Sequence, residues 1–244
     1  MHALLAMMML ATAAPAPGSA ALRPVRECVV LLHGLGRGPG SMRRIQDRLD
    51  AAGYLTWNEG YASRSSPIEA LAERYVATAL ADCRDRGAVR VHFVTHSLGG
   101  ILVRQYLQAH SVPELGRVVM LSPPNSGSEI ADRLRRHALY RWVMGPAGSE
   151  LGTGSDSIVR RLGALSAECG IIAGSASMDP WFGAWLPKPN DGKVSVASAQ
   201  LDGMRDFLVV PRTHAFIMRA DEVISEVLNF LAAGRFAHAA PRAG

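Results

Sequence analysis

Short, continuously apolar runs alternate along the chain with longer runs in which apolar residues recur every three or four positions. The apolar runs predict strands that are buried on both faces, because such strands have no polar face to show. They lie at 28–32, 54–57, 89–94, 117–121, 170–174 and 207–210. The helical runs lie at 41–52, 68–80, 101–109 and 220–231. This alternation predicts βα units joined by right-handed crossovers, and therefore an α/β fold whose central sheet is mainly parallel and carries helices on both faces.

The loops that follow several of these runs are rich in glycine and in hydroxyl side chains. The first run ends in His-Gly-Leu-Gly at 33–36, the third in Thr-His-Ser-Leu-Gly at 95–99, and the fourth in Ser-Pro-Pro-Asn-Ser-Gly-Ser at 122–128. Ligands of a parallel sheet gather at the carboxyl ends of its strands. We therefore expect the chemistry of the protein at this edge of the sheet.

One long segment, 128–166, interrupts the alternation with helical or irregular sequence and no clear strand. It brings several large apolar side chains close together: Leu139, Tyr140, Trp142, Val143 and Met144. Such an insertion either forms a mobile cover over a pocket or packs as an ordinary pair of helices. The sequence leaves both interpretations open.

The two ends of the chain differ in composition from the rest. Residues 1–21 hold an apolar block at 3–14, followed by small residues that include Gly-Ser-Ala at 18–20. This pattern predicts an export signal and a periplasmic or secreted protein, and the block is too short to span a bilayer. Because only His2 and the amino terminus supply positive charge, the alternative is a retained apolar leader on a cytoplasmic or membrane-associated protein. We expect a single domain at 22–234 and a flexible tail at 235–244.

Composition limits the classes of protein to which the chain can belong. Its 244 residues are 48% hydrophobic and 19% charged, which suits one domain with a sizeable core. The net charge is +5, but the arginines are scattered and only 6% of residues are aromatic. We therefore expect no nucleic-acid groove. We also expect no cofactor, no metal and no obligate protein partner.

The three cysteines, Cys28, Cys83 and Cys169, do not have the spacing of a metal site. If the predicted sheet forms, Cys28 and Cys83 lie at its amino-terminal edge near adjacent strands, where a disulfide could link them. The alternative, which we favour from the sequence, is that all three are small buried hydrophobic residues.

The third apolar run, its loop and the following helix surround Ser97. The segment 95–99 fits the G-x-S-x-G pattern that places a nucleophilic serine on a sharp, strained turn from strand to helix, with Thr95 in place of the first glycine. A serine in such a turn also fits a simple helix N-cap. The motif alone does not decide between nucleophile and cap.

A nucleophilic serine needs an imidazole to take its proton and a carboxylate to orient that imidazole. His214 follows the last predicted strand, beyond the serine in the chain, whereas we expect structural roles for His33 and His96. Asp191 lies in an Asn-Asp-Gly turn that exposes a carboxylate, although, taken alone, this residue is better explained as part of a plain surface turn. The competing carboxylates are Asp179, Asp202 and Asp206.

Two backbone N–H groups are needed to stabilise the oxyanion that forms during acyl transfer. They come from the loop after the first strand and from the residue after the nucleophile. Leu35 and Leu98 occupy these two positions. We expect their side chains to give the mouth of a pocket an apolar lining.

Five segments in this order resemble the signature segments of lipases and esterases of the α/β-hydrolase superfamily, and in particular relatives of bacterial triacylglycerol lipases. They are Val-Leu-Leu-His-Gly-Leu-Gly at 30–36, Thr-His-Ser-Leu-Gly-Gly at 95–100, Ser-Pro-Pro-Asn-Ser-Gly-Ser at 122–128, Asn-Asp-Gly-Lys-Val at 190–194, and His214. The resemblance runs from about residue 29 to residue 231. It implies an α/β-hydrolase fold, the catalytic triad Ser97, Asp191 and His214, and the oxyanion donors Leu35 and Leu98.

The third of these segments departs from the family pattern, because Asn125 and Ser126 replace the usual histidine and basic residue. The calcium site of some of those lipases has no evident counterpart. We expect a serine ester hydrolase that forms an acyl-enzyme on a small-molecule or lipid ester with an apolar acyl chain, with transient contact with lipid surfaces. The alternatives are an acyltransferase or thioesterase with the same triad, and a non-catalytic binding protein of the same fold.

Overall fold

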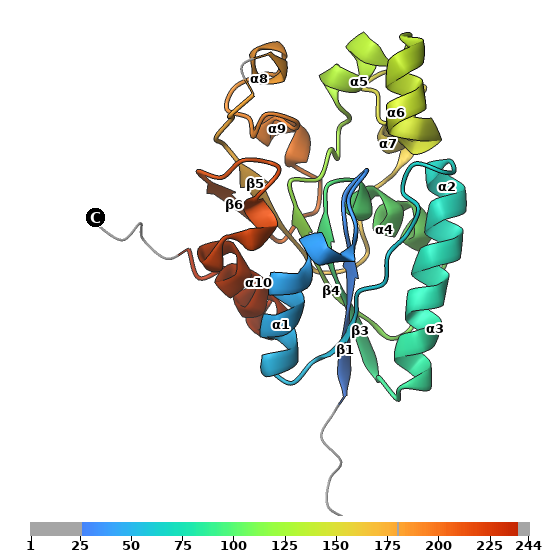
Figure 1. Ribbon diagram of the computed structural model, residues 1–244. Helices are drawn as coiled ribbons and strands as arrows, with labels where there is room; N and C mark the ends of the chain where they lie inside the picture. The colour runs from blue at the N-terminus through green and yellow to red at the C-terminus, as the bar shows by residue number, and fades with distance from the viewer. Residues whose placement is uncertain (1–25, 180, 239–244) are drawn as a thin grey trace, which may run out of the picture.

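The computed structural model describes residues 26–179 and 181–238, and within them one six-stranded sheet forms the centre of the molecule (Figure 1). The strand order is β2-β1-β3-β4-β5-β6, and every neighbouring pair is parallel. The strands are β1 (Glu27–Leu32), β2 (Leu55–Trp57), β3 (Arg90–His96), β4 (Leu115–Leu121), β5 (Cys169–Gly174) and β6 (Asp206–Val210). All six predicted strands and the parallel sheet are confirmed.

Helices cover both faces of the sheet, as predicted (Figure 1). One face carries α1 (Arg43–Ala51), η3 (Ile217–Arg219) and α10 (Asp221–Ala233). The other carries α2 (Ile68–Leu71), the π-helical turn η2 (Ala72–Val76), α3 (Ala77–Asp85) and α4 (Leu98–Ala109). A short 3-10 turn, η1 (Pro39–Ser41), precedes α1.

Alternate residues of each strand supply the two halves of the core. In β1, Val30 and Leu32 pack with the α2–α4 layer, whereas Val29 and Leu31 pack with the α1–α10 layer. All four side chains are fully buried. Because successive side chains of a strand point to opposite faces, a strand buried on both sides must be apolar throughout. This is why the continuous apolar runs identified the strands.

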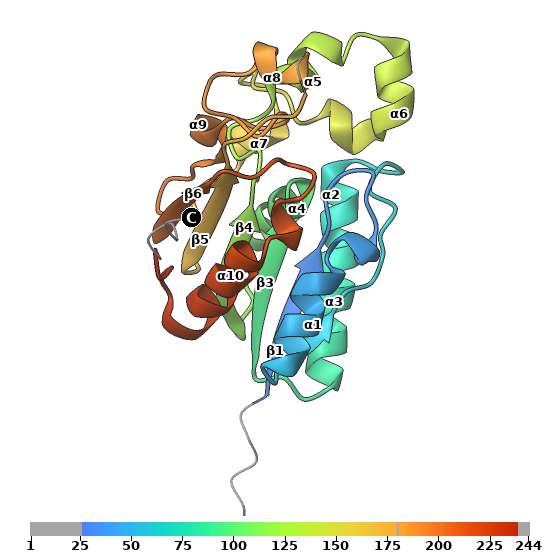
Figure 2. The ribbon, with the colours of Figure 1, turned by 60° about the vertical axis from the view of Figure 1, so that its left-hand side comes forward.

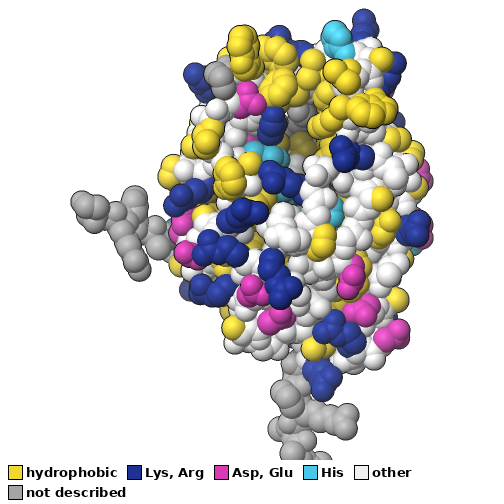
Figure 3. Space-filling model, viewed as in Figure 1, with side chains coloured by type: hydrophobic (Ala, Val, Ile, Leu, Met, Phe, Trp, Pro, Cys, Tyr) yellow, Lys and Arg dark blue, Asp and Glu magenta, His cyan; other side chains and the backbone are white. Residues whose placement is uncertain are grey.

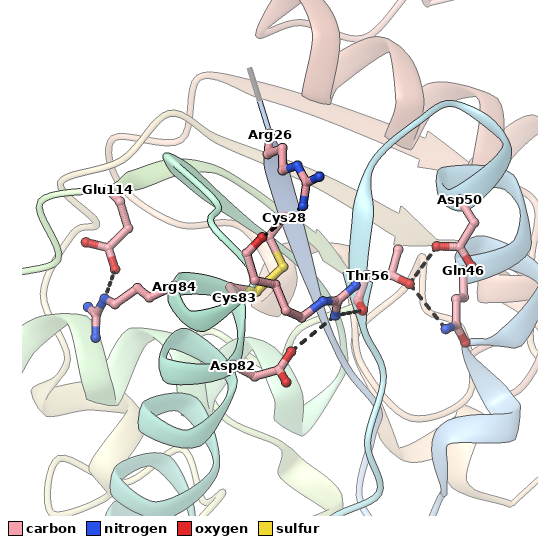
Figure 4. Close-up of a disulfide and its surroundings, with 10 residues drawn as sticks. Arg26, Cys28, Gln46, Asp50, Thr56, Asp82, Cys83, Arg84 and Glu114 are labelled. Carbon is pink, nitrogen blue, oxygen red and sulfur yellow. Dashed lines mark hydrogen bonds and ion pairs between the residues drawn. A yellow bond between two sulfur atoms is a disulfide. The ribbon is translucent and has the colours of Figure 1, made fainter. Parts of the chain in front are cut away.

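A disulfide joins Cys28 of β1 to Cys83 of α3 at the amino-terminal end of the sheet (Figure 4). The favoured expectation of three unpaired cysteines is therefore wrong for this pair, and Cys169 alone is a buried free thiol. The reason is that α3 lies directly against β1 and brings the two Cα atoms to 5.9 Å, within the range that a disulfide spans.

A further group of helices lies beyond the carboxyl-terminal edge of the sheet (Figure 2). They are α5 (Glu129–Leu134), α6 (Ala138–Ser149), α7 (Ile158–Arg161), α8 (Phe182–Trp185) and α9 (Val196–Ala199). The first three form the segment that was predicted to contain no strand, and none of its described residues is in one. At Gly145 the backbone of α6 has a φ of +68°, which kinks the helix before Pro146.

Arg104 of α4 anchors the start and the end of this insertion. Its buried guanidinium donates hydrogen bonds to the backbone oxygens of Asn125 at 2.9 Å, Leu162 at 2.7 Å and Gly163 at 3.3 Å. Burial lowers the pKa of Arg104 to about 10. Arg104 has no carboxylate partner among the described residues and is stabilised by backbone carbonyl oxygens and by Asn125 Oδ1, which accepts at 3.1 Å.

The predicted leader, 1–21, and the end of the predicted tail, 239–244, lie outside the described residues. Within the tail, Phe236 is buried and packs against Phe230 of α10, with ring centroids 5.0 Å apart. Among the described residues, no helix is both long enough and apolar enough to cross a bilayer.

Candidate active site

Ser97 occupies a sharp turn between the end of β3 and the start of α4. Its φ of 52° and ψ of −120° are unusual for a residue with a side chain and show backbone strain at this position. Its side chain makes no capping hydrogen bond with the helix, so the N-cap interpretation does not explain it. The helix begins at Leu98, three residues earlier than the apolar pattern suggested.

Two glycines after the serine allow the turn to be tight. A Cβ on Gly99 would lie 2.4 Å from the backbone oxygen of Leu32, so the helix can approach β1 this closely only with glycine there. A Cβ on Gly100 would lie 3.3 Å from Oγ1 of the buried Thr95. Gly100 therefore makes room for the threonine that replaces the first glycine of the motif.

The loop after β1 places the Leu35 N–H beside this turn. Arg37 N donates to Gly34 O at 3.1 Å, and Gly36, with a φ of 67°, completes the reverse turn. A Cβ on Gly34 would lie 3.2 Å from the Cβ of Ser97, which shows how closely the two loops approach. The Leu35 N–H donates no hydrogen bond to any residue that the structure describes.

Leu98 differs from Leu35 in the position of its side chain. As the first residue of α4, it has an N–H without a partner inside the helix. Its side chain, however, is fully buried in the core, so the expected apolar lining of the pocket mouth comes from Leu35 and not from Leu98.

A buried His33–Tyr61 pair supports the same loop. The His33 ring stacks on Tyr61 with centroids 4.1 Å apart. Its Nδ1 donates to Gly34 O at 2.9 Å, its Nε2 accepts from Tyr61 N at 3.3 Å, and the Tyr61 hydroxyl donates to His33 O. Burial lowers the pKa of His33, which favours the neutral form that these bonds require. The expected structural role of His33 fits this arrangement.

Asp191 and His214 meet although 23 residues separate them. His214 Nδ1 donates to Asp191 Oδ2 at 2.8 Å, and His214 N donates to Asp191 O at 3.0 Å. The other carboxylate oxygen, Oδ1, accepts from Lys193 N at 3.0 Å and Val194 N at 2.8 Å. The Asp191 side chain is completely buried, and that of His214 is 13% exposed.

Opposing effects set the pKa of the Asp191 carboxyl. Burial alone would raise it, but the positive charge of protonated His214 lowers it, as do the hydrogen bonds from His214, the Ser122 hydroxyl and the Val194 N–H. The net result is a pKa below the ordinary value of 3.8. The carboxylate is therefore ionised at neutral pH and can stabilise an imidazolium on His214.

His96 lies beneath this pair and is fully buried. Its Nε2 donates to His214 O at 3.0 Å, while its Nδ1 has no hydrogen-bond partner among the described residues. Burial, with smaller contributions from the charges of His214 and Arg37, holds the pKa of His96 well below 6.5. The neutral His96 ring thus supports the backbone of the His214 loop, which fits the structural role expected for it.

The competing carboxylates lie elsewhere. Asp179 pairs with Lys193 at 3.2 Å, Asp206 bonds His238 at 2.8 Å, and Asp202 is exposed in a turn. Of the sequence candidates, the structure brings only Asp191 to His214. Among the described residues, no group of three or more histidines, cysteines and carboxylates is arranged to hold a metal ion.

A cavity of about 190 Å³ joins these elements, and its hollow opens between hydrophobic side chains in Figure 3. Ser97, His214 and Leu35 line it, with Asp191 behind the imidazole. The insertion supplies a mainly apolar part of the lining: Ile130, Ala131, Tyr140, Met144 and Leu151. Sequence reasoning missed two cations at the same cavity, Arg37 and Lys193, because no spacing pattern marks them.

No protein-family model matches the chain, and no curated protein matches its sequence. Several solved structures are similar to it. The mature form of Bacillus licheniformis lipase BlEst2 has a TM-score of 0.71 and 18% identity, covering 88% of this chain and 96% of the lipase. A metagenomic carboxyl esterase has a TM-score of 0.64 and 20% identity, covering 83% and 68% of the two chains.

A third similar structure is that of Paleococcus ferrophilus monoacylglycerol lipase, with a TM-score of 0.58 and 16% identity over 86% of this chain and 96% of the lipase. At such identities the likenesses establish how the chain is folded. What the site does has to be argued from its own residues.

Proposed function

We propose that this chain, whose fold is the α/β-hydrolase fold expected from its sequence, is a serine ester hydrolase of the lipase or esterase type. One observation carries the proposal. Ser97, held in a strained turn, lines the same cavity as His214, and the Nδ1 of His214 is hydrogen-bonded to the buried carboxylate of Asp191. This is the set of roles that nucleophilic catalysis by serine requires.

The chemistry would proceed through an acyl-enzyme. His214 Nε2, the nitrogen left free by Asp191, takes the proton of the Ser97 hydroxyl as Oγ forms a bond to the ester carbonyl carbon. The N–H groups of Leu35 and Leu98 stabilise the oxyanion. The C–O bond to the alcohol then breaks, and His214 returns the proton to the leaving oxygen. Water repeats the sequence and releases the acid.

The surroundings of the cavity favour an apolar acyl chain. Its wall at the insertion is mainly apolar. Most of the large hydrophobic side chains that are exposed in the described structure lie in segments beyond the carboxyl-terminal ends of the strands: Leu139, Trp142, Val143, Met178, Trp181 and Phe216. These side chains also support brief contact with a lipid surface. A series of p-nitrophenyl esters, read as kcat/KM against chain length, tests the apolar pocket, because each bound methylene should improve kcat/KM.

The decisive test is Ser97→Ala. We expect it to abolish p-nitrophenyl ester hydrolysis and labelling by a fluorophosphonate probe, while Ser155→Ala, at an exposed serine of the insertion, leaves both intact. Turnover that survives Ser97→Ala sinks the proposal. An added alcohol that captures the acyl group in preference to water would indicate an acyltransferase. Wild-type protein that resists the probe would indicate a binding protein of the same fold.

We also propose that the insertion at 128–166 is a movable cover. Its helix α6 supplies Tyr140 and Met144 to the cavity, while Trp142 of the same helix is 81% exposed. A phosphonate bound covalently to Ser97 should therefore shift the tryptophan fluorescence of the protein, and Trp142→Phe should remove the shift. A response that is unchanged in Trp142→Phe would argue for a fixed helix pair.

Export remains our proposal for localisation. The apolar leader at 1–21 supports it, and so does the Cys28–Cys83 disulfide, because disulfides persist mainly in oxidising compartments. Mass spectrometry of the protein from its native host should show loss of the leader. An intact leader on cell-associated protein would favour the retained form.

A further inference from the structure

A second cleft, of about 370 Å³, lies beside the loop after β1 that carries Leu35, which we call the oxyanion loop. It is lined by Gly36, Arg37, Tyr61, Ser63, Arg64 and Ser65. Arg37 also lines the cavity that holds Ser97, so the two hollows share this side chain. The second cleft therefore adjoins the cavity that holds the reacting serine.

The two arginines of the cleft carry unneutralised charge. Neither has a carboxylate oxygen within 4.0 Å among the described residues, whereas nearby Lys193 is paired with Asp179 at 3.2 Å. The Arg37 guanidinium makes one long hydrogen bond, to Ala215 O at 3.5 Å. Arg64 uses one nitrogen for Val143 O at 3.0 Å. Since each guanidinium has five N–H donors, most of them are free for a ligand.

The loops bring these two side chains together. A Cβ on Gly36 would lie 3.9 Å from Cδ and Nε of Arg64, which places the Arg64 side chain directly over the glycine that precedes Arg37. The buried Ser63 accepts a hydrogen bond from Gly36 N at 2.9 Å, and its hydroxyl proton is free to point into the cleft. Two exposed arginines and a hydroxyl donor therefore line one cleft.

The position of His214 indicates which part of the ester, acyl or alcohol, lies near this cleft. As the acid, His214 must protonate the leaving oxygen, so the alcohol part of the ester lies on the His214 side of Ser97. Arg37 reaches Ala215, the residue next to His214. The apolar wall from Ile130 to Leu151 lies at the insertion and suits the acyl chain. Arg37 thus lies on the side of the alcohol part, and Arg64 borders the same cleft beside it.

We propose that Arg37 and Arg64 form a subsite for a phosphate group on the alcohol portion of the ester. A phosphate monoester carries close to two negative charges at neutral pH and offers three acceptor oxygens, which matches two free guanidinium groups and one hydroxyl better than a single carboxylate does. The inference rests on the proposed ester hydrolysis for its orientation. The anion site itself does not depend on turnover.

The test compares two soluble esters with the same acyl chain, the butanoyl esters of glycerol and of glycerol 3-phosphate. Wild-type protein should have the higher kcat/KM for the phosphate ester. Arg37→Gln and Arg64→Gln should each lower the ratio of the two kcat/KM values about tenfold, the size of one charge-assisted hydrogen bond. Arg48→Gln, at an exposed and unpaired arginine of α1, should leave the ratio unchanged. A wild-type ratio near one, or a ratio that Arg37→Gln and Arg64→Gln leave unchanged, overturns the subsite.

A binding experiment separates this proposal from the proposed function. Calorimetric titration of Ser97→Ala with glycerol 3-phosphate should show binding that disappears when Arg37→Gln is added. If wild-type protein hydrolyses neither the soluble esters nor vesicles that contain phosphatidic acid but this binding occurs, ester hydrolysis is wrong and the anion site stands. If the esters are hydrolysed without preference and no heat is seen, the anion site is wrong.

The phosphate could belong to a free ester or to a lipid headgroup. Vesicles that contain phosphatidic acid, tested beside the soluble esters, distinguish the two sources. Turnover of the soluble phosphate ester identifies a free ester, and turnover confined to vesicles identifies a headgroup. In either arm the preference for phosphate must be lost in Arg37→Gln, and a preference that persists there overturns the proposal.

Discussion

Replacing Asp191 by asparagine should abolish the proposed ester hydrolysis through the tautomer of His214. In the wild type, Asp191 Oδ1 accepts from the N–H groups of Lys193 and Val194, at 3.0 and 2.8 Å, and Oδ2 accepts from His214 Nδ1. The asparagine oxygen must keep the two backbone donors, so its NH₂ group faces His214. Nδ1 must then accept a hydrogen bond, and the imidazole proton moves to Nε2. That nitrogen can no longer take the proton of Ser97.

We expect kcat for p-nitrophenyl butyrate to fall about 10⁴-fold with KM little changed, which corresponds to about 5.5 kcal/mol of transition-state stabilisation. Thermal unfolding should change little, because the asparagine keeps the size of the aspartate and its bonds to the turn. Asp202→Asn, at an exposed turn, is the control and should behave as wild type. A kcat within about tenfold of wild type, in a folded Asp191→Asn protein, would refute the assigned role of this residue.

Three further predictions concern stability and the oxyanion loop. Burial lowers the pKa of three histidines: His33, His92 and His96. Unfolding lets each histidine bind a proton. The free energy of unfolding should therefore fall by up to about 1.4 kcal/mol per pH unit for each histidine as the pH drops below about 6.5. A free energy of unfolding, measured with urea, that stays constant down to about pH 5 would contradict this. Reduction of the Cys28–Cys83 disulfide, whose cysteines are 55 positions apart, should cost about 4 kcal/mol by the loop-entropy relation. An unchanged urea midpoint with dithiothreitol would argue against the bond. Gly34→Ala places a methyl group 2.8 Å from Nδ1 of His96. It should lower kcat about 10²–10³-fold by displacing the Leu35 N–H, and a wild-type kcat would show that the loop tolerates the shift.

Local sequence was enough to predict the sheet because each strand is buried on both faces. The run at 28–32 has no polar residue, and the structure places all of it inside. Element boundaries were less exact. The helix after Ser97 was expected from Ile101, because Gly99 and Gly100 weaken helical propensity, yet packing against β1 starts it at Leu98.

Some contacts between distant segments could not be decided from the sequence. The sequence left a Cys28–Cys83 disulfide open as the less favoured alternative, because only the packing of α3 against β1 brings the two Cα atoms within 5.9 Å. The juxtaposition of Arg37 and Arg64 depends on the way the loop at 61–65 folds over Gly36, and 27 residues of chain separate the two arginines. The chemistry of single residues can be predicted from motifs, whereas the neighbours of a site follow from the tertiary structure.

The bonds of Arg104 have a consequence for protein engineering. At the end of the insertion this side chain binds only main-chain oxygens, those of Leu162 and Gly163, and so it holds that end without regard to side-chain identity. The stretch between this anchor and Asn125 is in effect a cassette. Replacement segments of other lengths and sequences could be grafted there to change substrate preference, while the helix that begins after the serine keeps its place.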